Sequence, residues 1–198
     1  MRFVVLGAGS IGQRHLRNVL ALGHEVAAVF DPSPARLDEA RGIVRTACLL
    51  TAGEEQALDR EADAVIVCSP TSEHVRQARA AVGRGRHVLV EKPLSHTLDG
   101  TAELVEEAAA ARRAVLVGCN LRFLPSLQRV KRLVEEGRIG RPQAARAHCG
   151  YYLPYWRPRT DYRQGYGARQ ATGGGIILDS IHEFDYLCWL LGEPREAF

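Results

Sequence analysis

The sequence predicts an α/β protein whose N-terminal part is a doubly wound parallel sheet of the Rossmann type. Three observations support this fold class. Short apolar segments alternate with amphipathic helical patterns from residue 1 to about 118. The apolar segments are continuous runs rich in Val and Leu, which is typical of strands buried on both faces. A glycine-rich turn, G-A-G-S-I-G, follows the first of them, as it does in folds that bind dinucleotides.

The elements of this first part repeat as strand–helix units. Because each strand is followed by a helix, neighbouring strands should be parallel and helices should cover both faces of the sheet. We therefore assign residues 1–119 to a dinucleotide-binding domain. Its expected strands are 2–7, 25–31, 62–70, 87–93 and 114–120, and its expected helices are 10–22, 34–41, 72–82 and 97–111.

The pattern changes in residues 120–198. We expect an amphipathic helix at 126–140 closed by Gly137, a strand at 142–153, an irregular segment at 154–172 and a helix at 173–192. These elements are few for an independent core. We therefore expect residues 120–198 to be the truncated start of a second α/β domain for substrate binding and oligomerisation, with its remaining strands beyond residue 198.

Composition and charge exclude several classes of protein. A hydrophobic content of 46% and a charged content of 25% are those of a soluble globular chain. The net charge of +3 is too weak to indicate a nucleic-acid partner. No apolar run reaches the ~18 residues of a membrane span, and the apolar start is too short for a signal peptide. The scattered cysteines contain no C-x-x-C pair, so we expect no metal site, no disulfide framework and a cytoplasmic location.

The glycine-rich turn is the first candidate site. Gly7 would permit the tight turn, Gly9 would let a pyrophosphate approach the backbone, and Gly12 would let helix and strand pack closely. Ser10 and Ile11 open the helix, whose N-terminus offers N–H groups and the positive end of a dipole. The alternative is a glycine turn that binds nothing.

The ends of the next strands carry further candidates for cofactor binding. Asp31 lies 19 residues after Gly12, where an acid accepts hydrogen bonds from the ribose of NAD. A carboxylate repels a 2′-phosphate, so we favour NAD over NADP, although Arg36 nearby leaves NADP open. Ser69, Pro70 and Thr71 would lie at the ligand-binding edge of the sheet. His74 either joins them or is a surface residue of its helix.

The apolar strand H-V-L-V ends in a charged pair followed by proline, Glu91-Lys92-Pro93. Pro93 fixes its own φ, and its peptide bond to Lys92 could be cis. One interpretation is a solvated salt bridge that ends a strand. The other is a lysine held near a nicotinamide, desolvated so that its pKa falls and it can exchange a proton. The residues alone do not separate the two.

Several segments together resemble the glucose–fructose oxidoreductase / inositol dehydrogenase / MocA (Gfo/Idh/MocA) family over nearly the whole chain. These are G-A-G-S-I-G-Q-R-H, S-P-T-S-E-H-V-R-Q-A, H-V-L-V-E-K-P-L-S, N-L-R-F-L-P-S-L-Q-R-V and G-G-G-I-I-L-D-S-I-H-E-F-D. The resemblance implies a Rossmann domain followed by a domain with an open, mostly antiparallel sheet. It also implies NAD(P)-dependent oxidation or reduction of a hydroxyl or carbonyl on sugars, cyclitols or related compounds.

The resemblance also implies roles for single residues. Lys92 would contact the reacting hydroxyl, and Glu91 would orient Lys92 or approach the nicotinamide. Asp179 and His182 would complete a proton relay, and Asp185 could orient the imidazole. The spacing here is D-x-x-H, whereas many members have D-x-x-x-H. A spacing of three residues still places both side chains on one face of a helix. The alternatives are a surface acid for Asp179 and a core histidine for His182.

A segment rich in Tyr and Arg, residues 151–169, suggests the substrate. Aromatic faces suit sugar rings, and guanidinium groups suit carboxylate or phosphate, so we expect a sugar-like, anionic small molecule. The same composition is found at interfaces between subunits, and a homo-oligomer is expected if the second domain is complete. The expected substrate-binding residues are Lys92, Asn120, Arg122, Tyr152, Trp156, Arg157, Tyr166, Asp179 and His182.

The leading hypothesis is therefore an NAD-dependent dehydrogenase or reductase. One rival is a catalytically silent or fragmentary NAD-binding protein, suggested by the short second domain. Another is a lyase, epimerase or glycosidase that oxidises its substrate only transiently with retained NAD.

Overall fold

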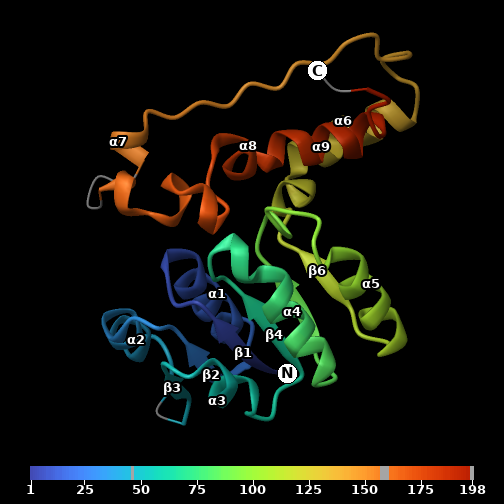
Figure 1. Ribbon diagram of the computed structural model, residues 1–198. Helices are drawn as coiled ribbons and strands as arrows, with labels where there is room; N and C mark the ends of the chain where they lie inside the picture. The colour runs from blue at the N-terminus through green and yellow to red at the C-terminus, as the bar shows by residue number, and fades with distance from the viewer. Residues whose placement is uncertain (46, 157–160, 197–198) are drawn as a thin grey trace. The chain divides into compact units, whose positions relative to one another are not determined.

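The structure is a computed structural model that describes residues 1–45, 47–156 and 161–196 (Figure 1). The chain divides into two compact units, Met1–Gly118 and Cys119–Phe198. None of the described helices is both long and apolar enough to cross a lipid bilayer.

Unit 1 is built on one parallel sheet in the order β3-β2-β1-β4-β5-β6, and every neighbouring pair of strands is parallel. This is the strand order of doubly wound dinucleotide-binding folds, with the switch point between β1 and β4. The predicted fold class is confirmed. The strands are β1 Arg2–Leu6, β2 Glu25–Phe30, β3 Leu49–Thr51, β4 Ala64–Val67, β5 His87–Val90 and β6 Val115–Val117.

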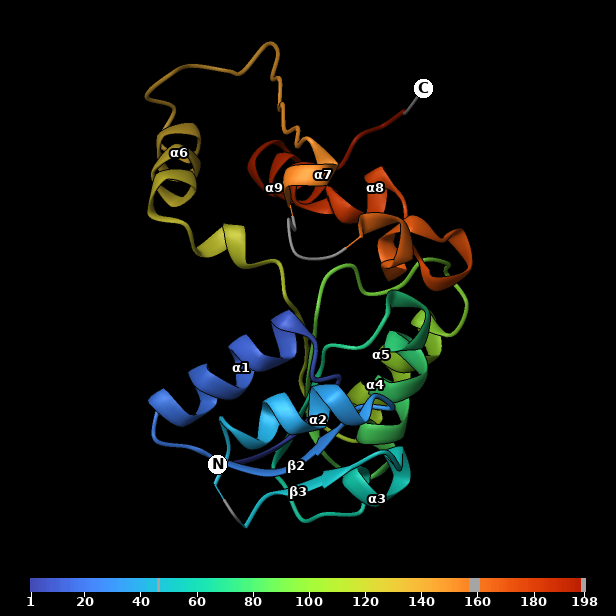
Figure 2. The same ribbon diagram turned by 90° about the vertical axis from the view of Figure 1, so that its left-hand side faces the viewer.

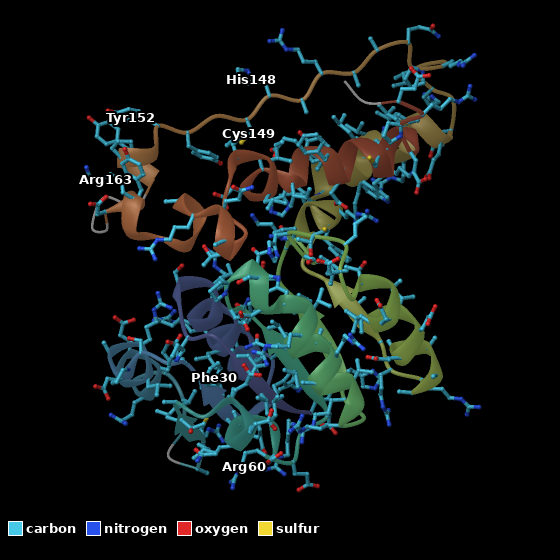
Figure 3. All side chains as sticks on the ribbon, viewed as in Figure 1. Phe30, Arg60, His148, Cys149, Tyr152 and Arg163 are labelled. Atoms are coloured by element: carbon cyan, nitrogen blue, oxygen red, sulfur yellow. The ribbon has the colours of Figure 1, made fainter. Side chains whose placement is uncertain are left out.

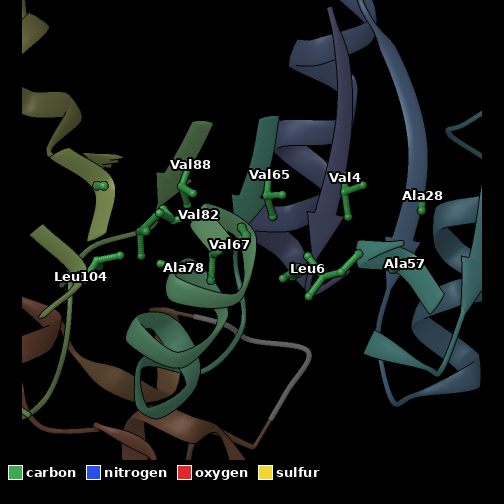
Figure 4. Packing of buried hydrophobic residues seen from close by; sticks show 14 residues of the cluster. Val4, Leu6, Ala28, Ala57, Val65, Val67, Ala78, Val82, Val88 and Leu104 are labelled. Carbon is green, nitrogen blue, oxygen red and sulfur yellow. The ribbon is translucent and has the colours of Figure 1, made fainter. Parts of the chain in front are cut away.

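Helices cover both faces of this sheet (Figure 2). Successive residues of a strand point to opposite faces, so Val5 of β1 packs with one layer of helices and Val4 with the other. Figure 4 shows the second layer, in which Val65 and Val67 of β4 belong to the same apolar cluster as Ala78. The first layer holds α1 Ser10–Ala21 and α2 Pro34–Arg41; the second holds α3 Glu54–Leu58, α4 His74–Gly83 and α5 Thr101–Ala110, with the 3-10 turn η1 Thr71–Glu73 before α4.

The prediction for unit 1 missed two elements, β3 and α3. They have three and five residues, which is too short for a hydrophobic period to be recognised. The predicted helix 97–111 begins later, at Thr101, because Gly100 before it has a positive φ of 73°.

Unit 2 consists of helices and short turns in its described part. α6 ends just before Gly137, whose φ is 66°, and Lys131 of α6 donates a hydrogen bond to the Trp189 carbonyl oxygen of α9 at 2.7 Å. The elements are η2 Asn120–Phe123, α6 Pro125–Glu135, α7 Leu153–Trp156, η3 Tyr162–Gln164, η4 Tyr166–Ala168, η5 Gln170–Thr172, α8 Ile176–Asp179 and α9 Ile181–Leu191.

Two predictions for unit 2 are wrong. The expected strand 142–153 is absent: residues 142–152 form no regular element, and α7 begins at Leu153. Figure 3 labels His148 and Cys149 on this extended stretch. A strand forms only when a neighbouring strand hydrogen-bonds to it, and the described residues of this unit provide no such neighbour. The expected helix 173–192 is interrupted at Ser180, with φ −97° and ψ 29°, which separates α8 from α9.

Candidate functional site

The turn between β1 and α1 requires glycine at two positions. Gly7 has a φ of 95°, and a Cβ there would lie 2.6 Å from the Cys68 carbonyl oxygen. A Cβ at Gly12 would lie 1.9 Å from the Gly7 carbonyl oxygen. These contacts hold the start of α1 tightly against the ends of β1 and β4.

Gly9 faces a more open space than Gly7 and Gly12. The nearest atom to a Cβ placed at Gly9 would be Arg36 Nη1, at 3.9 Å. The first turn of α1 contains no acidic residue, and its leading N–H groups lack partners within the helix. Open backbone, helix N–H groups and the positive dipole end together suit a phosphate group, so this turn fits the pyrophosphate of a dinucleotide.

The Asp31 carboxylate braces this turn. Its side chain is 1% exposed, and Arg36 Nη1 lies 3.6 Å from its Oδ2. Oδ2 accepts a hydrogen bond from the Ala8 N–H at 2.8 Å, and Oδ1 accepts one from the Ser33 N–H at 2.9 Å. A carboxylate has about four lone-pair positions, so these two bonds do not exhaust its acceptor capacity.

The end of β4 leads into a buried histidine. The Ser69 hydroxyl donates to Gln77 Oε1 at 2.6 Å, and Thr71 is buried. His74 is 2% exposed, so the alternative of a surface residue is wrong. Its Nδ1 lies 2.8 Å from the Pro93 carbonyl oxygen and its Nε2 lies 3.0 Å from the Ser69 carbonyl oxygen.

The E-K-P turn follows β5, with Lys92 partly buried and Pro93 buried. Glu91 Oε1 lies 2.7 Å from His15 Nε2 of α1. Burial opposes ionisation of Glu91, but the hydrogen bonds and charges of His15 and Lys92 together outweigh it and hold the pKa of Glu91 below its ordinary value. The Lys92–Pro93 peptide bond is cis.

The candidate residues for cofactor binding thus follow the carboxyl ends of β1, β2, β4 and β5, at one edge of the sheet. Sequence reasoning missed His15, three residues after Gly12. That spacing puts it on the helical face of Gly12, which packs against the sheet. The predicted residues at this edge are Gly7, Gly9, Ser10, Ile11, Gly12, Asp31, Ser69, Pro70, Thr71, His74, Glu91 and Lys92.

In unit 2, Arg122 forms a bidentate ion pair with Asp185 of α9. Arg122 Nη2 lies 2.6 Å from Asp185 Oδ1, and Nε lies 2.9 Å from Oδ2. The hydrogen bond to Asp185 raises the pKa of Arg122. Asp185 therefore anchors Arg122 to α9, one helical turn beyond His182. Asn120 lies exposed on the same turn as Arg122.

Asp179 and His182 lie on either side of the break at Ser180. A Cβ at Gly167 would lie 3.0 Å from Asp179 Oδ2, so Asp179 packs over η4. The Gly174 N–H donates to the Arg169 carbonyl oxygen at 2.9 Å. The glycine-rich segment thereby brings the short turns of residues 161–172 against α8.

The other predicted substrate residues lie in the segment rich in Tyr and Arg. Tyr152 is exposed and stacks edge-on against Tyr155, with ring centroids 5.0 Å apart. Figure 3 labels Tyr152 and Arg163 there. Trp156 ends α7 and Tyr166 begins η4. Arg157 lies outside the described residues.

The strand order, the glycine turn and the acid after β2 define a dinucleotide-binding Rossmann domain. Residues 1–119 match the family described as "Oxidoreductase family, NAD-binding Rossmann fold", and residues 127–198 match "GFO/IDH/MocA C-terminal domain". The chain belongs to the Gfo/Idh/MocA family of oxidoreductases.

The similarity to curated relatives and to a solved structure covers nearly the whole chain. It is 35% identical over 99% of its length to the 1,5-anhydro-D-fructose reductase of Ensifer adhaerens. It is 32% identical over 99% of its length to the myo-inositol 2-dehydrogenase of Thermotoga maritima. The chain spans only 58% and 56% of these two relatives. The structure of the WlbA (WbpB) dehydrogenase from Thermus thermophilus in complex with NAD and UDP-GlcNAcA aligns with a TM-score of 0.79 and 27% identity, over 99% of this chain and 64% of that one.

Proposed function

We propose that this protein is an NAD-dependent dehydrogenase or reductase acting on a hydroxyl or carbonyl carbon of a sugar, cyclitol or nucleotide-sugar derivative. One observation carries the proposal. The glycine turn, the Asp31 carboxylate and the E-K-P turn converge on one edge of a single parallel sheet. That edge is where doubly wound folds bind their ligands.

The proposal favours NAD over NADP. The Asp31 carboxylate adjoins the turn that suits the pyrophosphate, and a carboxylate repels a 2′-phosphate while accepting hydrogen bonds from ribose hydroxyls. Arg36 favours NADP instead, because its guanidinium lies 3.6 Å from the same carboxylate and an arginine at this place can bind a 2′-phosphate. NAD and NADP affinities, measured by titration calorimetry, will decide between them.

Lys92 is the proposed proton-transfer group. Of the 26 Lys and Arg residues, only Lys92 and Lys131 are lysines. Arginine stays protonated in proteins, whereas a lysine amine can exchange a proton when its surroundings lower its pKa. When bound, the nicotinamide would exchange a hydride with the substrate carbon. Lys92 would hold or remove the proton on the substrate oxygen, and His182 with Asp179 would pass it on.

The substrate is proposed to be anionic. The relatives act on polyols and sugars by name, one similar structure was solved with a nucleotide-sugar acid, and this chain has a segment rich in Tyr and Arg. Arg122 of η2 would act as one half of an ion pair with Asp185 of α9 rather than as an unpaired cation. We further propose that the protein is cytoplasmic and that it forms a homo-oligomer if its second domain is complete.

The test is a substrate panel containing inositols, anhydro-sugars, simple aldoses and UDP-sugar acids, with NAD reduction followed at 340 nm. The expected result is NADH formation with at least one polyol or sugar acid. Absence of net NADH together with exchange of isotope at a substrate carbon would instead support a lyase or epimerase with retained NAD. Tight NAD binding without either signal would support a silent binding protein.

A further inference from the structure

The E-K-P turn contacts a histidine on each side of Lys92. Before Lys92, Glu91 Oε1 lies 2.7 Å from His15 Nε2. After it, the Pro93 carbonyl oxygen lies 2.8 Å from His74 Nδ1. His15 belongs to α1 and His74 to α4, which cover opposite faces of the sheet. Lys92 is therefore the middle residue of a turn that is anchored from both faces.

The first anchor holds the Glu91 side chain. Glu91 is 17% exposed and His15 is 18% exposed. The second carboxylate oxygen accepts the Lys92 N–H at 3.2 Å and packs on Gly118, where a Cβ would approach it to 3.3 Å. The carboxylate is thus fixed by α1, by its own turn and by the chain after β6. The carboxylate of Glu91 is thereby held in one place, in the residue directly before Lys92.

The second anchor holds the backbone of Pro93. Both nitrogens of the His74 ring face carbonyl oxygens, those of Pro93 and Ser69. A neutral imidazole has only one N–H to donate. Burial lowers the pKa of His74 by more than the two carbonyls and the charges of Glu91 and Glu73 raise it, which favours the neutral ring. Only the tautomer with the proton on Nδ1 donates to the E-K-P turn.

We propose that His15 and His74 are positioning residues that fix Lys92 between two anchors, one on the side chain of Glu91 and one on the carbonyl of Pro93. Neither acts on the substrate itself. The inference rests on the proposed function, in which Lys92 transfers the proton. Its tests are chosen so that they need no substrate.

Lys92 can be followed without turnover because the chain has only one other lysine, Lys131. The rate of acetylation by an amine-reactive ester, followed by peptide mass spectrometry, reports the exposure and pKa of each amine. Lys131 is an internal control, because its Nζ is bound to the Trp189 carbonyl in unit 2.

The first variant pair tests the His15 anchor. His15→Leu removes the donor to Glu91, so the carboxylate is free to turn to the Lys92 ammonium and favour its protonated form, which does not react with the ester. Labelling of Lys92 should therefore slow about threefold. His15→Gln carries an amide N–H near the position of Nε2 and should restore the wild-type rate.

The second pair separates the two bonds of His74. Asn places its NH₂ near the position of Nδ1, and Gln places it near that of Nε2. His74→Asn should keep the bond to Pro93 and label as wild type. His74→Gln should keep only the bond to Ser69, release the turn and speed labelling of Lys92 about threefold or more, since local opening exposes the amine.

A matched control removes a histidine from the other end of the same strand. His87 Nδ1 accepts the Ala114 N–H at 3.1 Å at the start of β5, so His87→Leu should leave Lys92 labelling unchanged. Circular dichroism and NAD affinity establish that each variant is folded. Wild-type rates in folded His15→Leu and His74→Gln would overturn the inference.

A measurement on the unaltered protein covers the case of variants that do not fold. Nitrogen-15 NMR of the histidine rings gives the tautomer of each. The inference expects a proton on Nδ1 of His74 and on Nε2 of His15. A proton on Nε2 alone of His74 would overturn the second anchor. If Lys92 proves dispensable for turnover, the proposed function fails while these labelling and NMR results stand, so the two failures are distinguishable.

Discussion

A single buried carboxylate, Asp31, accepts a backbone N–H with each of its oxygens. Asp31→Asn would turn one acceptor into an NH₂ group that faces a donor. We expect the free energy of unfolding to fall by about 1–3 kcal/mol, the cost of a buried polar group left unsatisfied. Urea denaturation measures it. Asp38→Asn is the control, because Asp38 is 66% exposed. Equal stability of the two variants would contradict this role of Asp31.

The pKa values of His74 and Glu91 predict that acid destabilises the protein. Burial lowers the pKa of His74 in the folded state. As the pH falls below about 6.5, the unfolded chain binds a proton at this residue while the folded chain does not, so stability falls. The pKa of Glu91 is also lowered, through His15 and despite burial. Its contribution is present above about pH 4.3 and is lost at still lower pH, as the folded carboxylate becomes protonated.

Urea denaturation at a series of pH values measures this loss of stability. Wild type should lose stability between about pH 7 and 5, and His74→Asn should lose less over that range, because it has no ring to titrate. The same slope in both proteins would show that His74 does not carry the effect.

At the scale of single residues, the sequence predicted those candidates that are recognised from their spacing to nearby residues. Gly7, Gly9 and Gly12 stand in a fixed motif, and Lys92 follows a recognisable strand. The partners of His15 and His74 could not be predicted, because they are 76 and 19 residues away in the chain. Only the folded sheet brings these pairs together.

At the scale of elements, the contact between α1 and β1 depends on Gly12. A Cβ there would lie 1.9 Å from a backbone oxygen that cannot move aside. Gly12→Ala should lower the free energy of unfolding by about 2 kcal/mol or more and abolish NAD binding. Gly83→Ala is the matched control: it lies in α4 with no atom within 4 Å of its Cβ position, and should stabilise by about 0.4–1 kcal/mol. Thermal melts and NAD titration compare them, and similar behaviour of the two would refute the prediction.

The helices and strands also show which elements the sequence pattern could not predict. Long strands and helices of unit 1 were predicted, but β3 and α3 are shorter than the period that would reveal them. Residues 142–152 have the composition of a strand, yet a strand needs a neighbour. The break at Ser180 leaves no mark in the apolar pattern, which continues through α8 and α9.

At the scale of the whole molecule, the two units differ in how much core they contain. Among the described residues, every buried apolar side chain lies at or before Ala108, within unit 1. We therefore propose that residues 1–118 form an autonomous domain. Expressed alone, they should unfold cooperatively and bind NAD, whereas residues 119–198 alone should show no cooperative transition. Calorimetry of both fragments tests this, and a cooperative melt of the second fragment alone would contradict it.

We propose that Lys92 transfers the proton in an NAD-dependent hydride transfer. The most direct measurement compares wild type and Lys92→Ala for kcat at 340 nm and for NAD affinity by calorimetry. We expect kcat to fall by about 10²–10⁴-fold, the usual worth of a general acid or base, while the Kd for NAD changes less than about twofold. A Lys92→Ala enzyme that turns over at the wild-type rate would contradict the claim.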